Sequence, residues 1–179
     1  MKPLKERFEK EIMPKFMTDH GIKNKMAAPV PLKVVLNMGL GEALKDKGVV
    51  EIYLKDLELI AGQKAVPTKA KKSIADFNLK KGDVIGLKVT LRRDKMWHFI
   101  DKLINIVLPR VKDFRGISAT AFDATGTYTL GVTELVIFPE IDATKVVKTK
   151  GFAITISFSN GTKEYTSDLM KRLGFIFKE

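Results

Sequence analysis

Three stretches in which apolar and polar residues alternate constrain the fold of this chain most. In residues 85–92, apolar side chains at odd positions alternate with glycine, polar or charged residues at even positions. Residues 32–38 and 152–159 repeat the period with apolar residues at even positions, and only Val35 and Ala153 on the other face are apolar. A period of two is that of a strand with one buried face, whereas strands of a parallel doubly wound sheet are buried on both faces and give continuous apolar runs. The alternation therefore predicts an antiparallel sheet.

The segments around these strands have apolar residues at helical spacing. The predicted helices are residues 4–17 with a kink expected at Pro14, 45–61 with Gly62 as its stop, 94–109 with Asp94 as N-cap and Pro109 as its end, and 165–173 before Gly174. Helices beside alternating strands are typical of a sheet that is covered on one side only.

We therefore expect an α+β fold, an antiparallel sheet with helices packed on one face and a polar face on the other. Residues 27–31, with two prolines, predict a linker. Residues 110–150 are rich in Gly and Thr and predict an irregular region with short strands around Tyr128 and Val136. A length of 179 residues favours a single domain over residues 1–179, since domains average about 150 residues.

Composition excludes several kinds of site and points to an anionic partner. The chain has no Cys and two His, which excludes disulfides, thiol nucleophiles and zinc ribbons and gives a metal site little support. The 32 Lys and Arg residues outnumber the 21 Asp and Glu residues, for a net charge of +11. Such a surface attracts nucleic acid first and anionic membrane second. With no apolar run of about 18 residues and no targeting segment, we expect a cytoplasmic protein.

Most of the excess charge lies in one fifth of the chain. Residues 62–95 contain ten Lys or Arg and three Asp, so 10 − 3 = +7 of the total +11 falls there. An evenly solvated lysine surface is the simpler explanation for most charge runs. Two features nevertheless favour a binding site for a polyanion. The cations cluster in one stretch of the chain, and Lys88, Thr90 and Arg92 share one strand face.

Two neighbouring strands would combine their polar faces into one surface. The expected surface carries Lys33, Asn37, Lys88, Thr90 and Arg92. Cations neutralise phosphates, while Asn and Thr hydrogen-bond sugar hydroxyls and base edges in a shallow RNA minor groove. These strand faces carry no aromatic residue on which single-stranded bases could stack, so the pattern favours structured RNA.

The lysine-rich segment from Lys69 to Gly82 has two interpretations. It could be a hairpin arm that enters a groove or reaches a second RNA, or a mobile loop without a fixed partner. The sequence leaves both open.

Enzymatic interpretations are weaker. Gly39–Leu44, with Glu58 further on, resembles a dinucleotide fingerprint but has Leu44 in place of the third glycine, and Gly62–Lys69 has Pro67 where a phosphate loop needs glycine. The best-placed carboxylates, Asp123, Glu134 and Glu140, have no His partner. We therefore expect no catalytic residue, no metal and no cofactor. Saturable dinucleotide binding would revive the enzyme alternative, and liposome sedimentation would support a third one, membrane attachment through the first helix.

Several spaced motifs resemble one known family over nearly the whole chain. They are Leu36–Ala43, Leu57–Lys64, Thr68–Ser73, Lys88–Arg92 with Met96–Trp97, Asp113–Gly116 and Phe138–Asp142. Together they resemble the bacterial large-subunit ribosomal protein five family, which binds 5S rRNA.

The resemblance implies a noncatalytic protein that docks on 5S rRNA in the central protuberance. The expected rRNA-binding residues are Lys33, Asn37, Gln63, Lys64, Thr68, Lys69, Lys71, Lys88, Thr90 and Arg92. The family also reaches the peptidyl-site tRNA, a contact that we assign to Lys72, Lys80 and Lys81. Further expected partners are 23S rRNA and, through residues 110–150, small-subunit ribosomal protein thirteen in an intersubunit bridge; the free protein is expected to be a monomer.

The chain departs from the family pattern at one loop. Ala124–Thr127 replaces the usual Gly-basic-Gly-Asn before the tyrosine, and Thr133 and Leu135 replace a basic residue and Gln. The expected bridge is therefore assigned to the region and not to single residues.

Overall fold

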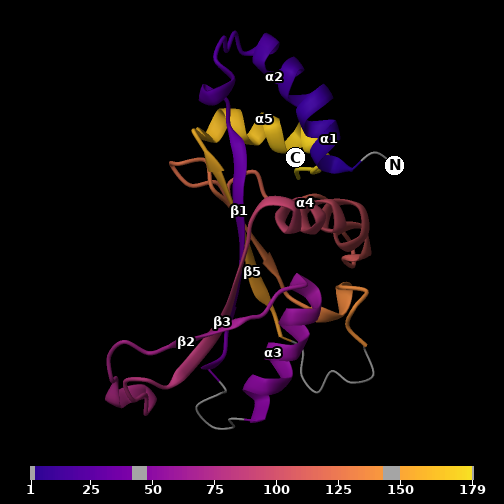
Figure 1. Ribbon diagram of the computed structural model, residues 1–179. Coiled ribbons are helices and arrows are strands. Elements are labelled where there is room, and N and C mark those ends of the chain that lie inside the picture. Colours follow the sequence, from indigo (N-terminus) through magenta and orange to yellow (C-terminus); the bar gives the residue numbers. More distant parts are fainter. Residues whose placement is uncertain (1–2, 42–47, 143–149, 179) are drawn as a thin grey trace. The chain divides into compact units, whose positions relative to one another are not determined.

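The computed structural model of the protein describes residues 3–41, 48–142 and 150–178 (Figure 1). Five strands form one antiparallel sheet in the order β2-β3-β1-β5-β4. They are β1 Val30–Gly39, β2 Val66–Lys69, β3 Val84–Leu91, β4 Tyr128–Val132 and β5 Phe152–Ser159. The predicted α+β class is confirmed.

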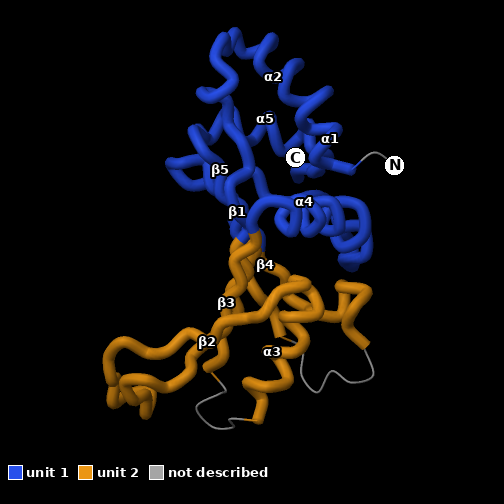
Figure 2. Tube along the Cα trace, in the orientation of Figure 1, with its two compact units in different colours: residues 1–34, 92–130, 155–179 blue, residues 35–91, 131–154 orange. Residues whose placement is uncertain are grey.

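The chain forms two compact units (Figure 2). Unit 1 consists of residues 1–34, 92–130 and 155–179, and unit 2 consists of residues 35–91 and 131–154. Strands β1, β4 and β5 have residues in both units. The expectation of a single domain stays a prediction, and each unit is described by itself below.

In unit 1, the first helical stretch is continuous but changes its hydrogen bonding. It consists of α1 Leu4–Arg7, the π-helical turn η1 Phe8–Ile12, and α2 Met13–Asp19. Leu4, Phe8, Ile12 and Phe16 are buried, as their spacing predicts. Pro14 has no N–H to donate, so the regular helical hydrogen bonds cannot continue through the turn before it. The π-helical turn η1 lies there.

The other helices of unit 1 are α4 Arg93–Lys102 and α5 Lys163–Leu173. Arg92, and not Asp94, is the N-cap of α4, so that prediction is wrong; Asp94 lies in the first turn and pairs with Lys5 at 2.8 Å. After α4 the chain continues through η5 Leu103–Val107 and the 3-10 turn η6 Leu108–Arg110, which contains Pro109. Helix α5 ends at Gly174, where φ is +112°, as predicted.

In unit 2, helix α3 Gly48–Ala61 packs on β3. Tyr53, Leu57 and Ile60 are buried, and Leu87, Val89 and Leu91 of β3 are buried too. Ile52, an apolar residue at helical spacing in the predicted helix 45–61, is exposed. Residues 45–47 of the predicted helix lie outside the described residues.

Three further expectations are wrong in detail. Leu32 has the right parity for the core but is 49% exposed. Strand β1 begins at Val30, inside the expected linker, and Pro31 is buried. Val136 lies in the 3-10 turn η7 Leu135–Ile137 and not in a strand.

Among the helices described, none has both the length and the apolar character needed to cross a membrane.

Candidate nucleic-acid interface

The register of unit 2 places polar side chains of three strands in adjacent rows. Strands β2 and β3 pair with Val66 opposite Lys88 and Thr68 opposite Gly86. The Leu40 N–H donates to the Ile85 carbonyl at 2.8 Å. Strands β1 and β3 are antiparallel, so three residues back along β1 from Leu40 correspond to three residues forward along β3 from Ile85. Asn37 therefore lies beside Lys88. Asn37, Lys88 and Val66 thus form one row across the sheet.

The next row is nearly bare of side chains. A Cβ on Gly86 would lie 2.6 Å from the Met38 carbonyl oxygen, 3.0 Å from Thr68 Oγ1 and 3.6 Å from the Gly39 Cα. Only glycine fits at this position, because the Met38 carbonyl belongs to the backbone and cannot move aside. The close approach of β1 to β3 at Gly86 fixes the position of the Asn37 row beside it.

We call this surface the platform and define it by five side chains of unit 2. They are Asn37, Val66, Thr68, Lys88 and Thr90. Asn37, Val66 and Lys88 are exposed, while Thr68 and Thr90 are half-buried. In the described part of the chain, none of the polar side chains of the platform has a hydrogen-bond partner. Their donors and acceptors are therefore available to a ligand.

Two predicted site residues belong to the other unit. Arg92 is exposed and Lys33 is half-buried, and both lie in unit 1, whereas the platform lies in unit 2. Within the described ranges, neither side chain makes an ion pair. Both remain candidate RNA contacts of their own unit.

Gln63 has a structural contact that its sequence position does not reveal. Its Nε2 donates to the Thr90 carbonyl at 3.1 Å, and so ties the segment after α3 to strand β3. Glu58 Oε1 accepts from the Ala65 N–H at 3.1 Å, which occupies the carboxylate that the dinucleotide alternative required. The Gln63 contact holds the segment before β2 against β3, and the Glu58 contact holds it against α3.

The lysine-rich segment forms a closed hairpin, which we call the arm and define as residues 70–83. At its base, the Ala70 N–H donates to the Asp83 carbonyl at 2.8 Å and the Gly82 N–H to the Ala70 carbonyl at 3.0 Å. Further out, Ile74 and Leu79 exchange two backbone hydrogen bonds of 2.9 and 3.1 Å. This ladder favours the hairpin interpretation over the mobile loop.

The arm carries an apolar tip that the sequence pattern did not predict. The tip is the 3-10 turn η4 Ala75–Phe77, followed by Asn78 with φ of +50°. Phe77 is 68% exposed and Ile74 is 43% exposed. The strand faces carry no such ring, and an exposed ring on a basic hairpin has the chemistry needed to stack on a base. In the sequence, the one sign of this tip is a phenylalanine followed by asparagine within a lysine-rich segment. That sign does not show that the ring is exposed, because its exposure depends on the 3-10 turn η4.

The cations of the arm and of the neighbouring strands are not neutralised internally. Lys64, Lys69, Lys71, Lys72, Lys80, Lys81 and Lys88 make no ion pair with any residue that the structure describes. Of the three acids in this stretch, Asp94 pairs with Lys5, and Asp83 Oδ2 accepts from the Lys80 N–H at 2.9 Å. The field of this segment therefore stays strongly positive.

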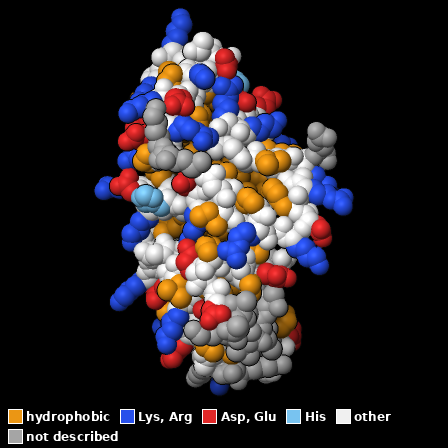
Figure 3. All heavy atoms as spheres, turned by 90° about the vertical axis from the view of Figure 1, so that its right-hand side faces the viewer, with side chains coloured by type: hydrophobic (Ala, Val, Ile, Leu, Met, Phe, Trp, Pro, Cys, Tyr) orange, Lys and Arg blue, Asp and Glu red, His pale blue; other side chains and the backbone are white. Residues whose placement is uncertain are grey.

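Other surfaces differ from this segment. On the face drawn in Figure 3, Lys and Arg side chains are interspersed with Asp and Glu side chains and with apolar ones. The charge excess of residues 62–95 is thus not repeated over that face.

The alternative sites do not assemble catalytic groups. Asp123 accepts hydrogen bonds from the Thr125 hydroxyl, the Thr125 N–H and the Thr127 N–H, and the Thr125 hydroxyl is the main cause of the lowered pKa of this carboxyl. It is occupied in closing a turn. Within the described ranges, no three His, Asp or Glu side chains are grouped so that they could hold a metal ion.

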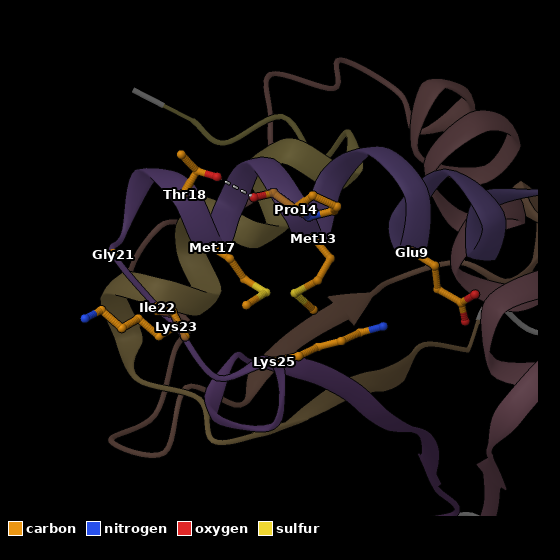
Figure 4. Close-up of a pocket in the computed structure, with 9 residues that line it drawn as sticks. All are labelled: Glu9, Met13, Pro14, Met17, Thr18, Gly21, Ile22, Lys23 and Lys25. Carbon is orange, nitrogen blue, oxygen red and sulfur yellow. Dashed lines mark hydrogen bonds between the residues drawn. The ribbon is translucent and has the colours of Figure 1, made fainter.

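A pocket of about 500 Å³ lies in unit 1 between α2 and residues 21–25 (Figure 4). The side chains of Met13 and Met17 point toward one another across it. The Thr18 hydroxyl donates to the Pro14 carbonyl at 3.0 Å and is therefore occupied. The lining lacks a nucleophile paired with a base, so the pocket does not support the enzyme alternative.

Comparison with known proteins gives consistent matches over the whole length. Residues 24–80 match the family model described as ribosomal protein L5, and residues 84–177 match the model for the C-terminus of the same ribosomal protein family. The chain is 51% identical over 178 residues to large ribosomal subunit protein uL5 of Geobacter sulfurreducens, covering 99% of each chain. It is 49% identical over 179 residues to the uL5 protein of Clostridium perfringens strain SM101, covering 100% of each. Against the uL5 protein of Kosmotoga olearia, identity is 48% over 176 residues, with 98% of this chain and 96% of the relative covered.

Proposed function

Since the chain belongs to the ribosomal protein L5 family, we propose that it binds 5S rRNA through the platform and helps to form the central protuberance of the large subunit. The resemblance read from the sequence motifs is thereby confirmed at the level of the family. The family is structural and not enzymatic, and its members are components of the ribosome, which in the bacterial relatives is cytoplasmic.

One observation carries the 5S rRNA proposal. Asn37, Lys88 and Thr90 project from adjacent strands and have no side-chain partner among the described residues, beside the point at which Gly86 lets β1 approach β3 closely. Lys88 supplies a phosphate contact, and Asn37 and Thr90 supply hydrogen bonds to ribose hydroxyls and base edges. Val66, 60% exposed in the same row, supplies an apolar contact to a ribose. This combination suits the minor groove of folded RNA.

The other predicted contacts supply charge. Lys64, Lys69 and Lys71 flank the platform residues along the chain, and Lys33 and Arg92 add cations from unit 1. We assign these residues to phosphates of rRNA. Gln63 has one amide hydrogen committed to Thr90, so we assign to it a supporting role and a contact through its Oε1.

The arm is the proposed contact to the peptidyl-site tRNA. Lys72, Lys80 and Lys81 provide charge along the hairpin, and Phe77 provides an exposed ring at its tip. Stacking of a ring on a base or ribose complements phosphate contacts, because it does not depend on sequence. The contact to small-subunit ribosomal protein thirteen stays assigned to residues 110–150, of which 143–149 lie outside the described residues.

A filter-binding assay with 5S rRNA transcript tests the proposal. The double variant Asn37→Ala, Lys88→Ala should bind about tenfold or more weakly, given a phosphate contact and a hydrogen bond of roughly 1 kcal/mol each. Lys55→Ala, at an exposed lysine of α3 that makes no ion pair with any described residue, is the control of equal charge loss and should bind within about twofold of the wild type. Equal binding by the double variant and the control, with unchanged melting curves, would overturn the assignment of the platform.

A further inference from the structure

The pocket of unit 1 has no part in the platform or the arm, although its walls are well defined. Helix α2 is followed by Gly21, whose φ of +63° reverses the chain. The Ile22 N–H then donates to the Met17 carbonyl at 2.9 Å. The chain therefore turns back along α2, and residues 21–25 form the second wall of the pocket (Figure 4).

Both walls are anchored to other parts of unit 1. The Phe16 ring of α2 lies 6.0 Å from the Tyr165 ring of α5. On the opposite wall, Asn24 Oδ1 accepts from the Met26 N–H at 2.9 Å, and the Met26 carbonyl accepts from Asn160 Nδ2 at 2.6 Å. The space between the two walls is therefore built into the fold.

The lining of the pocket is apolar inside and charged at one end. Met13 is buried, Met17 and Ile22 are half-buried, and the two thioether side chains point toward one another across the space. The Lys25 side chain extends past them toward Glu9 (Figure 4). A volume of about 500 Å³ with a mostly apolar lining and few polar groups is typical of a site for a small molecule.

The two charged groups at this end are available to a ligand. Glu9 and Lys25 are exposed, and neither makes an ion pair or a side-chain hydrogen bond with any residue in the described ranges. Lys5, the cation one helical turn before Glu9, is bonded to Asp94 at 2.8 Å. Lys23, the remaining charged residue of the lining, points away from the two thioethers. The end of the pocket therefore offers one carboxylate and one ammonium group.

We propose that this pocket binds a free α-amino acid with a large apolar or aromatic side chain. The ligand side chain lies between Met13 and Met17, because flexible thioethers adapt to irregular apolar shapes and make favourable contacts with aromatic rings. The ligand carboxylate accepts from the Lys25 ammonium group, and the ligand ammonium group donates to the Glu9 carboxylate. A fatty acid would fit the apolar lining but would bring a second negative charge close to Glu9.

This inference is independent of the RNA proposals. The pocket is lined by residues 9–25 of unit 1, whereas the platform and the arm belong to unit 2. Its two charged contacts are exposed and contribute modestly, so burial of the ligand side chain supplies most of the affinity. For phenylalanine we expect a Kd on the order of 1 mM.

Methyl NMR of the full chain, with labelled methionine, tests the location of the site. The chain has seven Met residues, so their methyl signals report on separate places. L-Phenylalanine should shift the signals of Met13 and Met17 in a saturable way and leave that of Met38, in unit 2, in place. Glycine, the same zwitterion without a side chain, should shift none of them.

Two derivatives and two variants test the charged contacts. L-Phenylalaninamide lacks the carboxylate and N-acetyl-L-phenylalanine lacks the ammonium group, so each should bind about fivefold more weakly than phenylalanine. Lys25→Ala should weaken phenylalanine binding about fivefold without weakening that of the amide. Glu9→Gln should do the same without weakening that of the N-acetyl derivative. The matched controls, Lys23→Ala and Glu164→Gln at exposed positions of unit 1, should bind phenylalanine within about twofold of the wild type.

Three results would overturn the inference. The Met13 and Met17 signals could stay in place up to the solubility limit of phenylalanine, which would show that the pocket takes no such ligand. Lys25→Ala could bind phenylalanine as well as Lys23→Ala does, or phenylalanine could bind no better than its two derivatives. Either result would show that the charged end does not recognise an amino acid. Because none of these measurements involves RNA, a failure of the 5S rRNA proposal would not affect them.

Discussion

Gly86 shows how one residue shapes the platform. Strand interiors disfavour glycine, yet here any side chain would meet the Met38 carbonyl of the neighbouring strand. The absent Cβ therefore permits the close pairing of β1 with β3.

We expect Gly86→Ala to lower the free energy of unfolding by about 1–3 kcal/mol, as other overpacked positions do. Urea titration followed by circular dichroism measures this loss. Gly131→Ala in β4 is the control, because a Cβ there would have nothing within 4 Å. If both variants unfold at the same urea concentration, the close approach of β1 at Gly86 is wrong.

A variant of Gln63 distinguishes a role in holding the fold together from a role in direct contact with RNA. In Gln63→Glu the Nε2 donor is lost and a carboxylate faces the Thr90 carbonyl, so the free energy of unfolding should fall by about 1–3 kcal/mol. Thermal melting without RNA measures this effect. Were the melting temperature unchanged while 5S rRNA binding fell, Gln63 would act by direct contact with RNA.

At the scale of elements, a charged cluster joins α2 to α5 within unit 1. Asp168 Oδ2 lies 3.0 Å from His20 Nε2 and 2.8 Å from Arg172 Nε, and Arg172 also contacts Asp19 at 2.7 Å. Partial burial would raise the pKa of Asp168, but the hydrogen bonds from His20 and Arg172 outweigh it and lower the pKa below its ordinary value of 3.8. The ionised carboxylate thus stabilises the fold.

A lowered pKa gives stability that is present above the unfolded value and is lost as the pH falls below it. Asp168→Asn should therefore melt at a lower temperature than the wild type at pH 6, and the difference should shrink below about pH 4, where the unfolded chain takes up the proton. Differential scanning calorimetry from pH 6 to pH 3 measures both. A difference that is constant over this range would show that the charge of Asp168 contributes nothing.

The exposed ring of Phe77 on the arm leads to a separate prediction. Because Phe77 is 68% exposed, Phe77→Ala should leave the melting temperature unchanged. Loss of one stacking contact, worth about 1–3 kcal/mol, should speed the release of peptidyl-site tRNA from ribosomes that carry the variant, by about tenfold. Leu59→Ala, at a similarly exposed apolar position of α3, is the control. Unchanged release would contradict the proposed contact of Phe77 with tRNA.

The elements that sequence predicted well are those with a regular period. Alternation located β1, β3 and β5, because a half-buried strand must separate apolar from polar residues. The errors fall where tertiary contacts decide. Leu32 has core parity but lies near the strand end and stays exposed. Asp94 has the side chain of a good N-cap, but it lies in the first turn of α4 and pairs with Lys5. Leu135–Ile137 is apolar enough for a strand, yet forms a 3-10 turn.

The candidate site was predictable in part, because some of its residues follow the regular period of a strand. Asn37, Lys88 and Thr90 follow from strand parity alone, and the structure places them on one surface. Val66 and Phe77 could not be found in this way, because the exposure of Val66 depends on its pairing with Lys88 and that of Phe77 on the turn at the arm tip. The supporting bond of Gln63 likewise requires the packing of α3 against β3.

At the scale of the whole molecule, the charge of +11 has a definite distribution. Ion pairs such as Lys5–Asp94 and Arg172–Asp168 neutralise part of unit 1, while the lysines beside the platform and on the arm stay unpaired within the described residues. Affinity for RNA should therefore be dominated by phosphate contacts and fall steeply with salt.

The salt dependence of 5S rRNA binding tests this account most directly. Neutralising about six phosphates predicts a slope of log affinity against log salt near −5. Replacing Lys64, Lys69 and Lys88 with Ala should make the slope shallower by about 3. The equivalent change at Lys15, Lys163 and Lys171, which lie outside residues 62–95 and make no ion pair with any described residue, should not. A wild-type slope near zero, or an equal change in both triple variants, would contradict the account.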